Sequence, residues 1–154
     1  MSIARQIIIA LLVSVGLNAL CPRGFAAGCE VSASPIVFGN YDSIHPADLV
    51  TVGTLVLRCS GVRGPVKIEL TAGDSQNFRQ RVMRLGSNQL SYNLYLDATA
   101  TSVWGDGSAG SQVFTTPAPS EGSLIRVAVY GRIQSRQDST AGAYRDSVSV
   151  RLIF

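Results

Sequence analysis

The sequence predicts an all-β sandwich, on the strength of two observations. Short runs of alternating apolar and polar residues recur through residues 27–154, and the apolar spacing of an amphipathic helix is missing there. Turn-forming residues separate the runs, as at Ala72-Gly73-Asp74, Gly86-Ser87-Asn88 and Gly105-Asp106-Gly107. Strands that recur roughly every ten residues favour a sandwich over a propeller or a closed barrel.

Eight segments are expected to form strands. The pattern is clearest in segment 66–70, where Val66, Ile68 and Leu70 point to one side and Lys67 and Glu69 to the other. One face of this strand is therefore expected in the core and the other in solvent. The expected strands are 30–33, 36–38, 49–59, 66–71, 89–96, 111–115, 124–133 and 147–154.

The last expected strand has a strong apolar face and no strand after it. Its inward residues, Val148, Val150, Leu152 and Phe154, alternate with Ser147, Ser149, Arg151 and Ile153 up to the final residue. Its outer backbone groups need a partner from elsewhere, so we expect a sheet that is completed in trans. The four residues are predicted to form the rim of an acceptor groove. The alternative is that they belong to the core of a complete sandwich, covered by an upstream segment.

The amino-terminal residues predict export. Arg5 precedes an apolar run over residues 7–17, which suits a secretory signal and is too short to span a bilayer. The small residues Gly24 and Ala26 suit cleavage before Ala27, which predicts a signal peptide over 1–26 and one domain over 27–154. A lipoprotein site at Cys21 is the weaker alternative, because Leu20 is a poor residue before the lipidated cysteine.

Cleavage at this position leaves two cysteines, Cys29 and Cys59. An even pair in an exported protein predicts a disulfide, which would tie the first strand to an early partner. Closing a loop of this length stabilises a fold by about 3 to 4 kcal/mol in the chain-entropy model. A metal site is not expected, because His45 is the one histidine. The close C-x-x-C pair of redox catalysts is absent.

Charge and residue pattern argue against nucleic-acid binding and catalysis. Loss of two arginines with residues 1–26 lowers the formal charge from +3 to +1, and the other arginines are scattered singly. Ser43, His45 and Asp48 lie close in sequence but lack a nucleophile elbow, so they do not predict a triad. No enzyme activity, cofactor or metal is expected.

Three large aromatic residues lie in the middle of the chain. Tyr92 and Tyr95 fall on opposite faces of one expected strand, so one is predicted in the core and the other partly exposed. Trp104 precedes a Gly-Asp-Gly turn and is expected to anchor that loop. An exposed aromatic ring could contact a surface or a sugar, but core packing is the favoured interpretation.

A set of short motifs, in order along nearly the whole of residues 27–154, resembles a known family. The motifs are Cys29-Glu30-Val31, Val37-Phe38-Gly39-Asn40-Tyr41-Asp42, Cys59, Arg81-Val82-Met83, Leu90-Ser91-Tyr92-Asn93-Leu94-Tyr95-Leu96-Asp97, Trp104-Gly105-Asp106-Gly107, Tyr130-Gly131-Arg132-Ile133, Gln137 and Gly142-Ala143-Tyr144-Arg145-Asp146-Ser147-Val148. Together they resemble the spore coat protein U domain, the domain of pilins of archaic, Csu-type chaperone-usher pili.

The resemblance implies an incomplete immunoglobulin-like β-sandwich that lacks its final strand and is completed by donor-strand complementation. The implied partners are a periplasmic pilus chaperone, an outer-membrane usher and an adjacent pilin subunit that donates a strand. The implied location is the periplasm and then the cell surface, in a pilus, or the extracellular space. Val148, Val150, Leu152 and Phe154 are then also the expected chaperone contacts.

One departure from the family pattern concerns the residues before the first strand. Shaft pilins carry an apolar donor strand there, whereas only Ala27 and Gly28 separate the expected cleavage site from Cys29. The expectation is a structural or adhesive subunit at the tip, although archaic tip adhesins usually have two such domains. The alternative function is a secreted spore or cell coat protein that folds alone. A surface or glycan ligand is left open.

Overall fold

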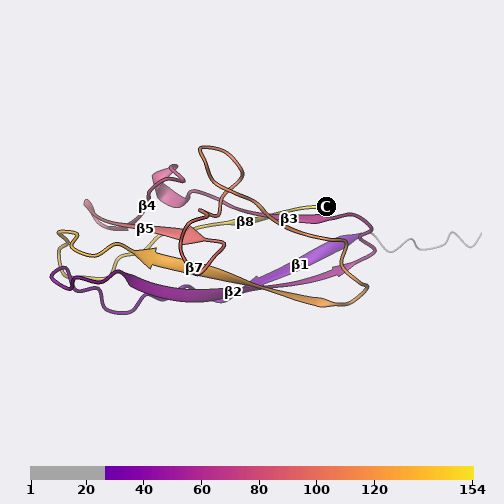
Figure 1. Cartoon of the computed structure of the whole chain (residues 1–154), viewed down its shortest axis with the longest axis horizontal. Helices are drawn as coiled ribbons and strands as arrows, with labels where there is room; N and C mark the ends of the chain where they lie inside the picture. Colours follow the sequence, from indigo (N-terminus) through magenta and orange to yellow (C-terminus); the bar gives the residue numbers. More distant parts are fainter. Residues whose placement is uncertain (1–26) are drawn as a thin grey trace, which may run out of the picture.

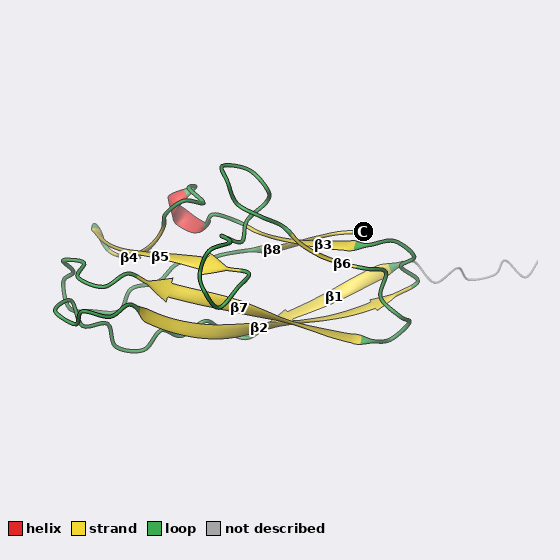
Figure 2. Ribbon diagram, in the orientation of Figure 1, coloured by secondary structure: helices red, strands yellow, loops and turns green. Residues whose placement is uncertain are grey.

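Residues 27–154 form two packed antiparallel β-sheets in the computed structural model, which describes this part of the chain (Figures 1 and 2). The predicted all-β sandwich is confirmed. A single turn of 3₁₀ helix, η1 (Gly73–Ser75), follows β3. The larger sheet has the order β1 (Gly28–Ala33), β2 (Leu49–Ser60), β7 (Leu124–Ile133), β5 (Asn88–Tyr95) and β4 (Arg81–Leu85). The smaller sheet has the order β6 (Phe114–Thr116), β3 (Val66–Leu70) and β8 (Val150–Ile153).

The apolar faces of the strands build one core between the sheets. From Gly53 onward in β2 and from Val127 onward in β7 every second residue is buried, as the alternation in the sequence predicts. Trp104 is fully buried, and its indole Nε1 donates a hydrogen bond to the carbonyl oxygen of Ile68 at 2.9 Å. The expected anchoring role of Trp104 is therefore confirmed. Tyr92 is buried and Tyr95 is half-buried, which confirms the prediction for these two residues.

Four strand predictions need correction. Segment 36–38 is not a strand, because the chain leaves the β2 ladder after Ser34, whose amide donates to the carbonyl oxygen of Thr54. The side chains of Ile36 and Phe38 turn inward instead. The strand β4 was not expected, because the inward position of Arg81 interrupts its apolar pattern. The observed β6 and β8 are also shifted or shorter than the predicted segments 111–115 and 147–154.

Two glycines on the inner face of the larger sheet make room for these inward side chains. A Cβ atom on Gly53 would lie 2.7 Å from Ile36 Cγ1, and one on Gly131 would lie 2.8 Å from Phe38 Cζ. The Phe38 ring also meets the Tyr92 ring edge to face, with centroids 5.8 Å apart. Segment 34–38 therefore follows the sheet closely and fills the interior at one end of the sandwich.

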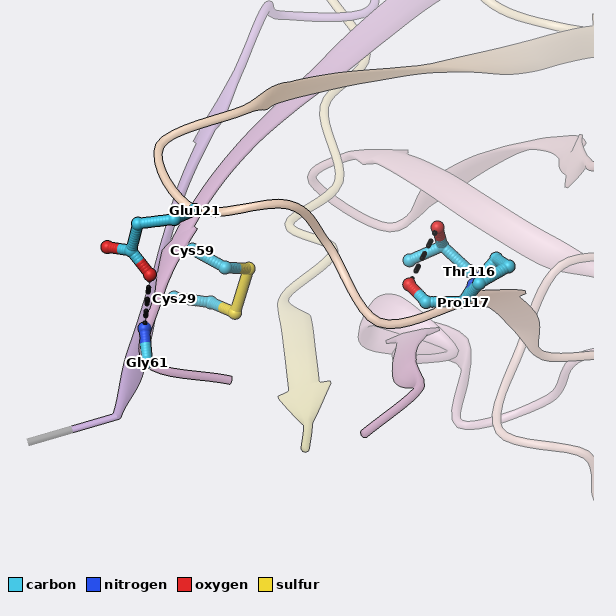
Figure 3. The surroundings of a disulfide bond; sticks show 6 residues. All are labelled: Cys29, Cys59, Gly61, Thr116, Pro117 and Glu121. Atoms are coloured by element: carbon cyan, nitrogen blue, oxygen red, sulfur yellow. Dashed lines mark hydrogen bonds between the residues drawn. A yellow bond between two sulfur atoms is a disulfide. The ribbon is translucent and has the colours of Figure 1, made fainter. Parts of the chain in front are cut away.

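The predicted disulfide between Cys29 and Cys59 is present and joins β1 to β2 (Figure 3). The two residues are direct partners in the antiparallel register. The loop between β6 and β7 is fastened at the same place, since the Gly61 amide donates to Glu121 Oε2 at 2.9 Å (Figure 3). The start of β1 is thus held covalently and by neighbouring hydrogen bonds.

The predicted signal peptide over 1–26 and its alternative at Cys21 lie outside the described residues. Within residues 27–154, no helix has the length and apolar character needed to cross a membrane.

Candidate functional site

The candidate site begins at the outer edge of β8. One side of β8 pairs with β3, and no strand within residues 27–154 pairs with the other side. The Thr71 amide donates to the carbonyl oxygen of Ser149, and antiparallel pairs alternate between bonded and non-bonded positions. By this alternation Val150 and Leu152 direct their backbone N–H and C=O groups to the open side.

The outer edge of β1 is open in the same way. The Ser34 amide bonds to Thr54, so the alternation places Cys29, Val31 and Ala33 at non-bonded positions relative to β2. The Cα atoms of Cys29 and Cys59 are 4.0 Å apart, which agrees with the close spacing of such a pair. Within the described chain, β1 of the larger sheet and β8 of the smaller sheet are therefore edge strands with backbone groups that no other strand pairs with.

A groove of about 580 Å³ lies between the two open edges. One wall is formed by residues 33–36 and Phe38, which continue β1, and the other by residues 144–148 and Val150, which lead into β8. Its floor is apolar and comes from both sheets. The floor residues are Leu55, Leu70, Met83, Tyr92, Leu94 and Val129.

The four predicted rim residues take different positions. Val148 and Val150 line the groove. Leu152 is half-buried and packs against the core outside the groove lining. Phe154 is 55% exposed and is also absent from the lining. The first-strand wall with Ile36 and Phe38 was missed as part of the site, because no local pattern shows that a segment more than 100 positions away will face β8.

A hydrogen-bonded pair of residues lies in the groove lining. The Tyr92 hydroxyl donates to Asp146 Oδ2, while Asp146 Oδ1 accepts from the amides of Asp74 and Ser147. Burial and the hydrogen bond to Asp146 raise the pKa of Tyr92 well above its ordinary value. The phenol therefore stays a neutral donor and fixes the segment that leads into β8.

A fully buried arginine supports the groove floor from β4. Arg81 Nη2 donates to the carbonyl oxygens of Thr71 and Trp104 at 2.8 and 2.7 Å, and Nη1 donates to Asn93 Oδ1 at 2.6 Å. Its guanidinium carbon lies 5.4 Å from the ring centroid of Phe78. Burial lowers the pKa of Arg81, but an arginine side chain stays charged in a folded protein. Arg81 therefore joins β4, β5 and two loops behind the groove.

Ser43, His45 and Asp48, the residues weighed as a possible catalytic triad, lie outside the groove lining. Asp48 Oδ2 is 2.6 Å from Arg132 Nε, and its Oδ1 accepts from the Ser135 amide. The Ser135 amide and Arg132 hold the pKa of Asp48 below its ordinary value. His45 is exposed, and its Nδ1 accepts from the Ala47 amide. No hydrogen bond between Ser43, His45 and Asp48 side chains is found among the described residues, and no three His, Cys, Asp or Glu side chains group there as metal ligands.

The fold and the groove together define a class of protein: an immunoglobulin-like sandwich in which no strand of residues 27–154 lies between the open edges of β1 and β8. The model of the Spore Coat Protein U domain matches residues 20–151. The chain belongs to this family.

Two known proteins resemble the chain. Protein U of Myxococcus xanthus is 29% identical over 146 residues, a match that covers 87% of this chain and 77% of Protein U. A chain of the CsuC–CsuE chaperone–tip adhesion subunit pre-assembly complex, from archaic chaperone-usher Csu pili of Acinetobacter baumannii, matches with a TM-score of 0.61 and 23% identity. That match covers 83% of this chain and 40% of the other, so this chain spans less than half the length of that structural relative.

Proposed function

We propose that this chain is an exported, non-enzymatic structural or adhesive subunit of a surface pilus assembled by the chaperone-usher pathway. The observation that carries the proposal is the apolar groove between two strand edges with unpaired backbone groups. A β-strand from another chain satisfies both features at once, because its backbone bonds to the edges while its alternate side chains fill the groove.

The groove lining supports a strand as the occupant. Val148 and Val150 face the groove, and the backbone of Val150 is directed to the open edge of β8. Across the groove, β1 offers the free groups of Val31 and Ala33. An inserted strand with apolar residues at every second position would cover floor residues such as Leu94 and Val129, which lie in the core between the sheets. Burial of such side chains stabilises by about 1.5 to 3 kcal/mol each.

The proposed partners follow from this mode of completion. A periplasmic chaperone lends the strand during export, an outer-membrane usher receives the complex, and an adjacent subunit supplies the strand in the fibre. Membership of the Spore Coat Protein U domain family supports this route, as does the likeness to a complex of a chaperone with a tip adhesion subunit.

The proposed position of the subunit is the pilus tip. Residues 28–33 are paired with β2, and Cys29 is bonded covalently to Cys59. This part of the first strand is therefore committed to its own sandwich and is not free for donation. Immunogold labelling at pilus ends would support the tip position, and labelling along the shaft would contradict it.

The test of strand acceptance is periplasmic expression of the chain with and without a periplasmic pilus chaperone of the archaic type. Soluble yield and stoichiometry on a sizing column are the measurements. We expect a one-to-one complex with the chaperone and little soluble protein alone.

The competing function is a secreted coat protein that folds alone and packs into a layer. The similarity to Protein U and the spore coat name of the family favour this candidate. A stable monomer that melts cooperatively without a chaperone would support the coat protein and contradict the pilus subunit.

A further inference from the structure

A second cavity, of about 370 Å³, lies at the tip of the β4–β5 hairpin. The hairpin contributes Ser87, Asn88 and Gln89, and a loop over residues 138–144 contributes the opposite wall. Figure 1 shows this hairpin tip and this loop at the end of the sandwich that is opposite the marked C-terminus. We call the cavity the polar pocket and the loop the arch.

The arch is fastened at both ends, which gives the polar pocket a defined shape. Before the arch, Gln137 Nε2 donates to the carbonyl oxygen of Ser91 at 2.8 Å, and Gln137 Oε1 accepts from the Ser91 amide at 2.8 Å. After the arch, the amides and carbonyls of Arg84 and Arg145 exchange two hydrogen bonds, of 2.8 and 3.1 Å. A pocket held in this way loses little conformational entropy when a ligand binds.

The arch is also packed tightly at its centre. Gly142 lies so close to the hairpin that a Cβ atom there would be 2.4 Å from Leu85 Cδ2, and its φ is +151°. The Tyr144 hydroxyl donates to the carbonyl oxygen of Thr140 at 3.0 Å, which braces the arch across its own turn. Tyr144 lines both the polar pocket and the groove.

The lining of the polar pocket selects the chemistry of its ligand. It contains the amides of Asn88 and Gln89, the hydroxyls of Ser87, Ser139, Thr140 and Tyr144, and one carboxylate, that of Asp138. The lining includes no arginine or lysine, so it has no positive charge to bind an anion. It includes one carboxylate, which is too few ligands to hold a metal ion. Without an aliphatic side chain it offers little to an apolar ligand.

We propose that the polar pocket binds a neutral saccharide. Amide and carboxylate groups match the paired donor and acceptor character of adjacent sugar hydroxyls. The Tyr144 ring supplies the one aromatic surface, on which the apolar face of a sugar ring can rest. The side chains of Asn88, Gln89, Asp138 and Ser139 make no hydrogen bond to other groups of residues 27–154, so their hydrogen-bonding capacity is free for a ligand.

The test is saturation-transfer NMR on the purified chain with glucose, galactose, mannose and N-acetylglucosamine, each at up to about 50 mM to detect weak binding. The chain is used free or with its chaperone, whichever form is soluble, with the chaperone alone as the blank. The result therefore does not depend on the proposed function. We expect saturable binding of at least one of these neutral sugars and none of glucuronic acid at the same concentration.

Two variants locate the binding. Asp138→Ala and Gln89→Ala remove exposed side chains that make no intramolecular hydrogen bond in the described chain, and we expect sugar affinity about tenfold and fivefold weaker, respectively. Gln112→Ala is the matched control, because Gln112 is exposed and lies outside the polar pocket. No binding of any neutral sugar, equal binding of glucuronic acid, or unchanged affinity in both pocket variants would each overturn the proposal.

Discussion

Replacing Val150 by Asp is expected to prevent strand capture. Val150 lines the groove, and its backbone is directed to the open edge of β8, so its side chain becomes buried when a strand is inserted. Loss of the apolar contact removes roughly 1 to 2 kcal/mol, and burial of an unpaired carboxylate costs at least as much again. The sum of about 3 kcal/mol corresponds to a loss of affinity of more than about 100-fold.

The assay is co-expression with the chaperone, followed by a sizing column that separates the one-to-one complex from free chaperone. Ser149→Asp is the matched control, because Ser149 is the adjacent residue, is exposed and faces away from the groove. It introduces the same side chain at the position directly before β8, so any general effect of Asp at this end of the strand appears in both variants. We expect near-normal complex with Ser149→Asp and almost none with Val150→Asp.

A milder variant separates groove occupancy from folding. Val150→Thr keeps the approximate shape of the side chain and replaces one methyl group by a hydroxyl, so its capture is expected to be intermediate, with affinity about tenfold weaker than that of the parent. Equal complex formation by Val150→Asp and Ser149→Asp would refute the reasoning that this face of β8 receives the partner strand.

Three further predictions concern the stability of the sandwich. Cys29→Ser should lower the free energy of unfolding by about 3 to 4 kcal/mol, measured by urea titration under oxidising conditions, and an unchanged midpoint would show that the disulfide is dispensable. Arg81→Met should cost at least about 3 kcal/mol in the same titration, because three buried acceptors lose their donor; a loss below about 1 kcal/mol would contradict this account. The Thr99 hydroxyl and nearby amides hold the pKa of Asp97 well below its ordinary value, so the charged form stabilises the fold above about pH 4, and this stabilisation disappears as the pH falls further. Asp97→Asn should therefore flatten the fall in melting temperature between about pH 5 and pH 2, and an identical slope in parent and variant would argue against it.

The strands that alternate cleanly could be predicted from the sequence, because the side-chain period of a strand is local. Val66, Ile68 and Leu70 are buried as their spacing indicates, and β7 has the predicted bounds. The pairing of Cys29 with Cys59 could also be predicted, since these were the two cysteines left in the expected mature domain. The strand β4 could not be predicted, because a charged residue at an inward position contradicts the binary pattern.

The composition of the groove depended on tertiary structure. The sequence by itself determined that the last strand has an apolar face and that Val148 and Val150 lie on it. Tertiary pairing decided that β8 is an edge strand, that segment 33–38 forms the opposite wall, and that Leu152 packs away from the opening. It also surrounded the buried Arg81 with acceptors from three separate segments. The physical reason is that periodicity records which side of a strand is apolar, whereas the neighbours of that side come from residues distant in the chain.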